Sequence, residues 1–167
     1  MIFPEFQNSY VIDEIRAKYD PLADLVRLHI TLVFPFEGPF DNETLRRILN
    51  CRLKGIEPFR LSVKGAGAQK TGSGNFLFLD IVRGEDEVRK IHDILYANEF
   101  KRFEPEFDYY PHITVGNLPS EVLLDEAYED IKELEEEFHT TVTKISVEMI
   151  GEHEESIIII EKELGQA

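Results

Sequence analysis

The sequence contains the triplet His-Ile-Thr twice, and each copy is followed by an apolar residue. The copies begin at His29 and His112, 83 positions apart in a chain of 167 residues. In a β-strand, residues two positions apart point to the same face, so each copy would present an imidazole beside a hydroxyl. The other residues of each copy would face the core: Ile30 and Leu32 in the first, Ile113 and Val115 in the second. The repeat therefore constrains the chain to two related halves that bring two such strands together.

The spacing of apolar residues predicts the same order of elements in each half: a helix, the motif strand, a helix and two strands. In the first half we expect helices over 11–19 and 41–54, the motif strand over 29–34, strands over 59–64 and 76–82, and turns over 65–75. In the second half we expect helices over 85–98 and 120–138, with strands at the motif, over 144–149 and over 157–160.

A duplicated unit of this kind packs about a pseudo-twofold axis. We therefore predict a single bilobal α+β domain over 1–167, with approximate repeat halves 1–83 and 84–167. Two antiparallel sheets would line a central cleft, with the helices outside, and the two motifs would face each other across that cleft.

Composition narrows the setting and the partners. Cys51 is the only cysteine, so no intrachain disulfide is possible, and we expect its side chain to be buried by packing of its helix. No stretch resembles a signal peptide or a membrane span, which favours a cytoplasmic protein without a membrane partner. The net charge of −15 argues against a long nucleic-acid duplex, although a small phosphate ligand is compatible with it. The oligomeric state is open.

The paired histidines stand apart from the other three. His139 also begins an H-x-T triplet, but its counterpart one repeat earlier is Ile56. We expect His92 to lie at a helix edge and His153 to be solvated in a turn. His29 and His112 are therefore the candidate acid/base residues.

Other side chains are weaker candidates. Thr31 and Thr114 follow the two histidines and are candidate phosphate-binding residues. Tyr109 and Tyr110 precede the second motif, where they would either stack on a base or pack in the core or at its rim. Lys64 precedes a glycine-rich stretch and Lys70 lies within it; both are either ordinary surface residues or residues that attract a phosphate.

The paired motifs resemble those of the two-histidine (2H) phosphoesterase superfamily. The stretch from Ile15 to Pro21, which leads to His29-Ile30-Thr31-Leu32-Val33-Phe34-Pro35-Phe36, and the stretch Pro111-His112-Ile113-Thr114-Val115-Gly116 are similar to those of bacterial 2′-5′ RNA ligase-like proteins. Leu28 departs from the pattern, since relatives often carry proline there. The resemblance implies metal-independent chemistry, without a cofactor, at 2′,3′-cyclic phosphates or 2′-5′ phosphodiester bonds of nucleotides or RNA ends.

The residue types fit that chemistry. A neutral imidazole can remove a proton from the attacking hydroxyl while a protonated one donates to the departing oxygen, because histidine titrates near working pH. The threonines would hold the non-bridging oxygens. Three alternatives stay open: a module that binds a nucleotide or RNA end without turnover, a metal site built on the histidines, and docking of a basic partner on the acidic helix over 120–138.

Overall fold

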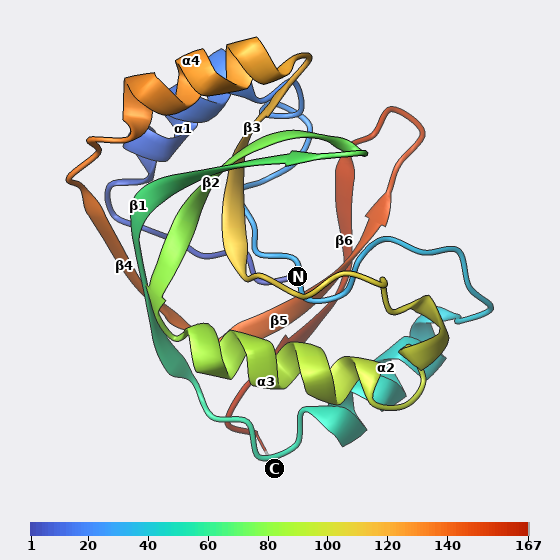
Figure 1. Ribbon diagram of the computed structural model, residues 1–167. Helices are drawn as coiled ribbons and strands as arrows, with labels where there is room; N and C mark the ends of the chain where they lie inside the picture. Colours follow the sequence, from blue (N-terminus) through green and yellow to red (C-terminus); the bar gives the residue numbers. More distant parts are fainter. Residues whose placement is uncertain (167) are drawn as a thin grey trace.

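Two antiparallel sheets form the framework of the computed structural model, which describes residues 1–166 (Figure 1). The four-stranded sheet has the order β3-β2-β1-β4. Its strands are β1 (Phe59–Thr71), β2 (Gly74–Arg83), β3 (His112–Leu118) and β4 (Glu137–Val142). The second sheet pairs β5 (Lys144–Ile150) with β6 (Ser156–Glu163). The predicted α+β class with two antiparallel sheets is confirmed.

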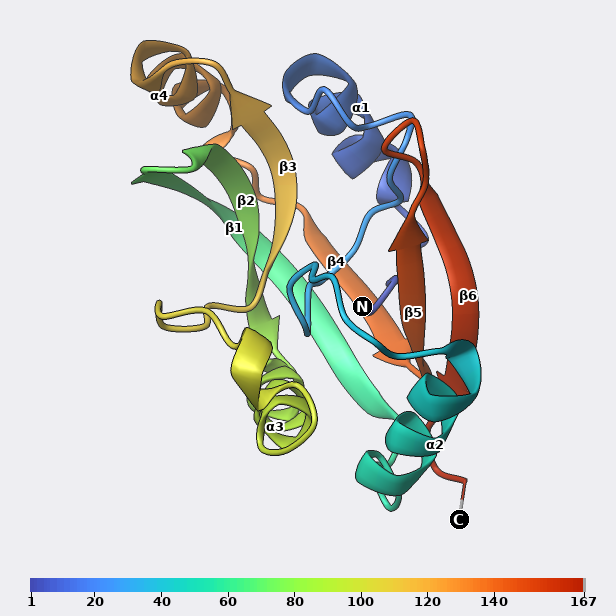
Figure 2. The same cartoon turned by 90° about the vertical axis from the view of Figure 1, so that its right-hand side faces the viewer.

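The helices are α1 (Ser9–Tyr19), α2 (Asn42–Arg52), α3 (Glu85–Tyr96) and α4 (Glu121–Ile131), with a short 3-10 helix, η1 (Lys101–Phe103), after α3. Side-chain caps mark two of the predicted starts. Asp41 accepts a hydrogen bond from the Thr44 amide at 2.8 Å, and Ser120 accepts one from the Leu123 amide at 3.3 Å. Helices α1 and α4 lie at one end of the molecule, and α2 and α3 lie at the other (Figures 1 and 2).

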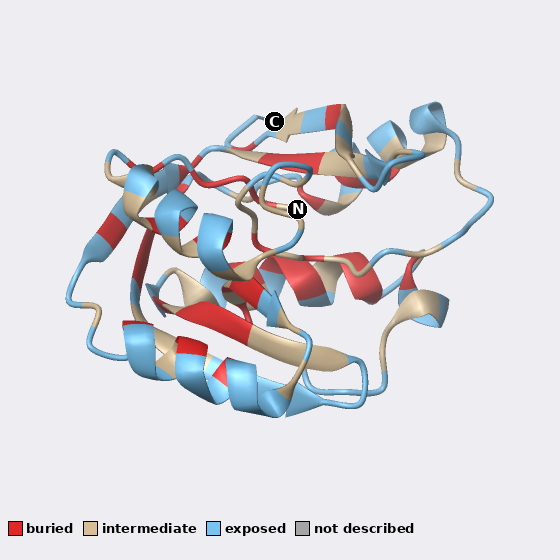
Figure 3. Cartoon of the chain, turned by 90° about the horizontal axis from the view of Figure 1, so that it is seen from above, coloured by how far each residue is buried: buried red, intermediate tan, exposed pale blue. Residues whose placement is uncertain are grey.

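One contiguous hydrophobic core joins the two sheets and the helices. Buried residues lie on the strands and on the helix faces turned toward them, whereas the outer helix faces are exposed (Figure 3). On the four-stranded sheet the core face carries residues that are fully buried: Leu61, Val63, Leu77, Leu79, Ile113 and Val115. Burial of these side chains fixes which face of the sheet is left for His112 and Thr114.

The large sheet draws its strands from both halves of the chain. Strands β1 and β2 follow the first motif in sequence, yet they share a sheet with β3, which carries the second motif and pairs with β2. The register places Asp80 of β2 opposite His112 and Phe78 opposite Thr114. Figure 2 shows β1, β2 and β3 together on one side of the molecule, with β5 and β6 on the other.

The structure corrects three of the expected elements and one side chain. Residues 29–34 do not form a strand; Ile30 makes only an isolated bridge to Ile2. The helix expected over 120–138 ends at Ile131, and β4 begins at Glu137 because the fully buried Phe138 pairs in register with Val63 of β1. The stretch expected as turns continues β1 and β2 as a hairpin, in which Thr71 pairs with Gly74. Cys51 is exposed rather than packed inside.

The missing strand has a local cause. Ile2 provides the one ladder contact of the first motif among the described residues, and this antiparallel ladder stops on both sides. Pro4, which would face Leu28, has no amide hydrogen to donate, and Met1 exchanges its backbone hydrogen bonds with Ser146 of β5 instead. Ile30 exchanges both of its backbone hydrogen bonds with Ile2, at 2.8 and 3.0 Å. A single exchanged pair is too short to count as a strand, although the segment is held at that point.

Candidate active site

The second motif lies on β3, at the edge of the large sheet. His112 and Thr114 are half-buried, whereas Ile113 and Val115 are fully buried, as the strand alternation predicts. The Phe78 ring lies beside the His112 ring, with 4.9 Å between the centroids. A β-ladder and an aromatic neighbour thus hold this imidazole.

The first motif shows the same alternation without the strand. His29 and Thr31 are half-buried, and Ile30 and Leu32 are fully buried in the shared core. The Phe3 ring lies 6.2 Å from the His29 ring between centroids. Burial of the two aliphatic residues therefore reproduces in an irregular segment what the sheet does for the second motif.

Both imidazoles are oriented by the same backbone contact. The Nδ1 atom of His29 lies 2.8 Å from the carbonyl oxygen of Arg27, and Nδ1 of His112 lies 2.7 Å from that of Tyr110. In each case the carbonyl belongs to the residue two positions earlier. A carbonyl only accepts, so the contact assigns the proton of a neutral ring to Nδ1 and leaves Nε2 for chemistry.

Burial lowers the pKa of both histidines below the ordinary value of 6.5. For His29 the Arg27 carbonyl and the charge of Glu148 oppose the shift. For His112 the Tyr110 carbonyl opposes it, whereas the charge of His29 lowers the pKa further. The two imidazoles therefore interact electrostatically, and protonation of one disfavours protonation of the other.

The two candidate tyrosines have different surroundings. Tyr110 is exposed; its Oη donates to Oδ1 of Asp80 at 2.7 Å, and its ring stacks toward His112 at 6.0 Å between centroids. Tyr109 is half-buried, and its Oη donates to the backbone carbonyl of Thr31 at 2.6 Å. Tyr110 thus lies beside the second histidine, while Tyr109 connects the second motif to the first.

The two candidate lysines lie on β1. Lys64 is exposed and pairs in register with Glu137 of β4. The Nζ atom of Lys70 lies 3.0 Å from Asp125 and 3.5 Å from Glu121, both carboxylates of α4. The structure therefore places Lys70 in a surface ion-pair group with α4.

The remaining histidines are separate from the pair. His139 lies on β4 with Nδ1 2.8 Å from Oγ of Ser62, and His153 is exposed in a turn, as expected. His92 is not at a helix edge: it is 4% exposed, and its ring stacks on the Tyr109 ring. Its place in the α3 pattern gave no signal of this, because its neighbour Tyr109 comes from a distant segment.

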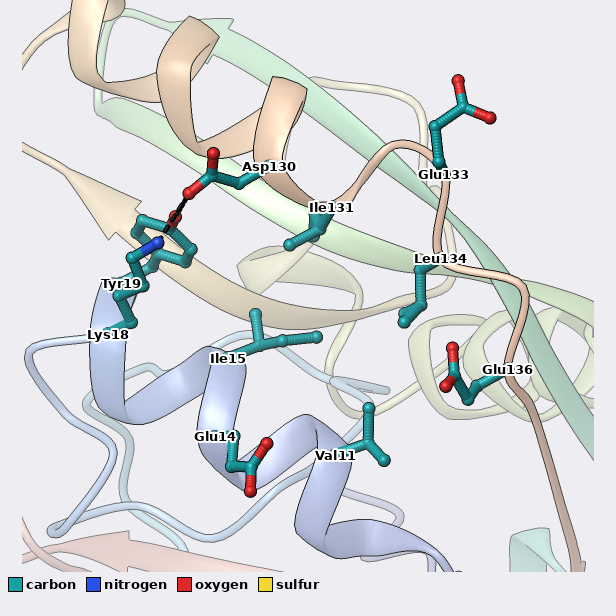
Figure 4. Close-up of a pocket in the computed structure, with 10 residues that line it drawn as sticks. All are labelled: Val11, Glu14, Ile15, Lys18, Tyr19, Asp130, Ile131, Glu133, Leu134 and Glu136. Atoms are coloured by element: carbon teal, nitrogen blue, oxygen red, sulfur yellow. Dashed lines mark hydrogen bonds and ion pairs between the residues drawn. The ribbon is translucent and has the colours of Figure 1, made fainter.

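Two hollows lie outside the histidine pair. A cavity of about 670 Å³ is bounded by α3 and the segment 104–110, and Tyr110 is among its lining residues. A groove of about 460 Å³ lies between α1 and the end of α4, where Lys18 and Tyr19 both contact Asp130 (Figure 4). Its floor is apolar and its rim carries Glu14, Glu133 and Glu136.

Across residues 1–166 no three His, Cys, Asp or Glu side chains are grouped so as to hold a metal ion. No helix within the described chain has the length and apolar character needed to cross a bilayer.

Comparisons with known proteins identify related phosphoesterases. A Geobacillus kaustophilus protein provisionally named a phosphoesterase is 31% identical over 154 residues, which cover 86% of this chain and 82% of that protein. A Methanothermobacter thermautotrophicus protein named RNA 2′,3′-cyclic phosphodiesterase is 35% identical over 116 residues, 65% of this chain and 60% of that protein.

The fold and the family of the chain also have known counterparts. A crystal structure of a phosphoesterase has the same fold, with a TM-score of 0.58 over 93% of this chain and 92% of that one, at 16% identity. The profile of the 2′-5′ RNA ligase superfamily matches residues 2–153, a span that includes both motifs. The chain therefore belongs to the 2′-5′ RNA ligase superfamily of two-histidine phosphoesterases.

Proposed function

We propose that this protein hydrolyses or transfers at 2′,3′-cyclic phosphate or 2′-5′ phosphodiester linkages of nucleotides or RNA ends, without a metal ion. His29 and His112 are its acid/base pair, and Thr31 and Thr114 bind the phosphate. The observation that carries the proposal is the matched orientation of the imidazoles, each with Nδ1 held by the carbonyl two residues earlier. The name of the Methanothermobacter relative supports the cyclic phosphate as substrate.

The reaction needs one neutral and one protonated imidazole. The neutral Nε2 removes a proton from water as the water oxygen bonds to phosphorus. The protonated Nε2 of the other histidine donates its proton to the ribose oxygen as the bond from phosphorus to that oxygen breaks. The product is a phosphate monoester with a free ribose hydroxyl, and the histidines end with their protonation states exchanged.

The two threonines stabilise the negative charge on the phosphate. Each hydroxyl would donate to a non-bridging oxygen, where negative charge shifts during the attack. The two motifs supply equivalent groups, so the histidines can exchange roles between the forward and reverse directions. The strong overall acidity favours a small nucleotide or a single RNA terminus as substrate over a long duplex.

The test is turnover of nucleoside 2′,3′-cyclic phosphates and of a 2′-5′ dinucleotide in the presence of EDTA, with products separated by chromatography. We expect His29→Ala and His112→Ala each to lower kcat by about 10²- to 10⁴-fold, the usual contribution of a general acid or base. His139→Ala is the matched control, because His139 also begins an H-x-T triplet but lies on β4 beside Ser62. It should retain wild-type turnover.

The alternative function is binding without turnover by the same four residues. Absence of turnover on every substrate, together with measurable binding of a nucleoside 2′- or 3′-monophosphate that His29→Ala and His112→Ala abolish, would replace the proposed hydrolysis with that function. Loss of activity in EDTA that zinc restores would instead point to a metal-dependent site.

A further inference from the structure

The first motif has fewer backbone ladder contacts than the second. The second motif has the β2 ladder, but the first has only the exchanged pair between Ile30 and Ile2. Backbone polar groups that are withdrawn from water must find partners elsewhere. The hydrogen bonds of residues 31–34 therefore identify what positions His29 and Thr31.

Two tyrosine hydroxyls from the second half of the chain supply those hydrogen bonds. Oη of Tyr109 donates to the carbonyl of Thr31 at 2.6 Å, and Oη of Tyr96 accepts from the amide of Phe34 at 3.0 Å. One contact satisfies an acceptor within the motif, and the other satisfies a donor three residues later. The two hydroxyls thus hold both ends of the segment from Thr31 to Phe34.

The two tyrosines are themselves packed against one imidazole. The His92 ring lies parallel to the Tyr109 ring, at 8° and 3.7 Å between centroids, and its centroid lies 4.8 Å from that of Tyr96. His92 and Tyr96 are 4% and 1% exposed, and Nε2 of His92 is buried without a hydrogen-bond partner among the described residues. A buried polar atom left unpaired costs free energy. The ring contacts with Tyr109 and Tyr96 are therefore the interactions that stabilise His92 at this position.

The same short segment also holds the second motif. The carbonyl of Tyr109 accepts from Nη1 of Arg89, which anchors the segment to α3. The carbonyl of Tyr110 contacts Nδ1 of His112. Residues 109 and 110 therefore contact the first motif through a side chain and the second motif through the backbone.

We propose that Tyr96 and Tyr109, packed around His92, form a clamp that sets the position of the first motif relative to the second. Within the proposed function, on which this inference rests, Tyr109 is a positioning residue and not a substrate contact. The two hydroxyls replace the β-ladder that the first motif lacks. Because the clamp acts on the Thr31 and Phe34 backbone, its loss displaces the His29–Thr31 pair and leaves His112 in place.

The kinetic test removes one hydroxyl at a time and keeps the rings. In Tyr109→Phe and Tyr96→Phe we expect kcat on a nucleoside 2′,3′-cyclic phosphate to fall about 10- to 100-fold, since small misplacements of reacting groups cost up to about 10² in rate. KM should rise by no more than about threefold, because Thr114 on β3 stays in place and Thr31 is shifted rather than removed. Tyr10→Phe is the control, since Tyr10 is 63% exposed on α1 and its loss of a hydroxyl should leave kcat unchanged.

A second measurement is independent of activity. Hydrogen exchange of the Phe34 amide should accelerate in Tyr96→Phe, because that amide loses its acceptor. In Tyr109→Phe the amides of residues 32–34 should exchange faster. The amides of Ile113 and Val115 in β3 should keep wild-type exchange in both variants. If kcat of the folded variants stays within twofold of wild type, the clamp does not position the catalytic groups and the proposal is overturned. If the wild-type protein turns over no substrate, the proposed function fails, and the exchange rates alone decide whether the clamp exists.

Discussion

The ion pair of Arg16 with Asp20 should be among the most sensitive points of the fold. The Arg16 and Asp20 side chains are only 6% and 9% exposed, and they meet at 2.8 and 2.9 Å. Arg16 also donates to the carbonyl of Val26 at 2.7 Å, and Asp20 accepts from the amide of Leu22 at 3.0 Å. These contacts fasten the end of α1 to the loop that leads into His29.

The substitution Arg16→Met keeps an unbranched apolar stem and removes the guanidinium with its charge. It leaves the Asp20 carboxylate almost buried without its partner, and breaking a buried pair in this way costs about 3–5 kcal/mol. The hydrogen bond from Arg16 to the Val26 carbonyl belongs to the same network, so the cost of losing it is included in this figure of about 3–5 kcal/mol and is not added to it. We therefore expect the free energy of unfolding to fall by about 3–5 kcal/mol.

Urea denaturation followed by circular dichroism measures the change, provided that the m-value is constant. Lys132→Met is the matched control, because Lys132 pairs with Glu129 at 2.6 Å but the two side chains are 37% and 63% exposed. An exposed pair of this kind contributes about 0–1 kcal/mol. If Arg16→Met costs no more than Lys132→Met, the reasoning from burial is refuted. The double variant Arg16→Met/Asp20→Asn should recover part of the loss, because no charge is then left unpaired.

Two further predictions concern the second motif and the pH dependence. Because burial lowers the pKa of both His29 and His112 below 6.5, the singly protonated pair is most abundant at acidic pH, and kcat/KM should follow a bell with its maximum below pH 6.5. The unfolded chain also takes up these protons at higher pH than the folded one, so their contribution to the free energy of unfolding declines as the pH falls below 6.5. A maximum of kcat/KM above pH 7.5 would imply raised pKa values and would contradict both statements. Gly67→Ala should destabilise by about 1–3 kcal/mol and lower kcat, since the added Cβ would lie 2.3 Å from the ring of Phe78, which packs against His112. Gly72→Ala, whose Cβ would meet nothing within 4 Å, is the control in both the urea and the activity assays.

Local patterns were sufficient wherever an element is stabilised by its own sequence. Helices expected from residues 41 and 120 begin there, where Asp41 and Ser120 cap α2 and α4, and apolar spacing located α1 and α3. The alternation in both His-Ile-Thr motifs gave the correct buried and half-buried positions, since it depends only on which residues are apolar. The candidate catalytic and phosphate-binding residues remain predictions of that motif together with family membership.

Elements that depend on distant partners were assigned incorrectly. β4 was expected as the end of a helix, because the acidic stretch before it has no strand pattern; pairing of Phe138 with Val63 made it a strand. The glycines of β1 suggested turns, whereas Gly67 provides the space that the Phe78 ring occupies across the hairpin. In both cases a contact more than ten residues away in sequence decided the backbone.

By itself, the sequence predicted which side chains are candidates for chemistry and determined which of their neighbours are buried, because residue type and a two-residue period suffice for that. Only the tertiary structure decided how the two motifs are held: one by the β2 ladder, the other by hydroxyls of Tyr96 and Tyr109. The two tyrosine contacts join positions that are 62 and 78 residues apart. Hydrogen-bond partners at such distances are selected by packing of the whole core and leave no periodic trace in the chain.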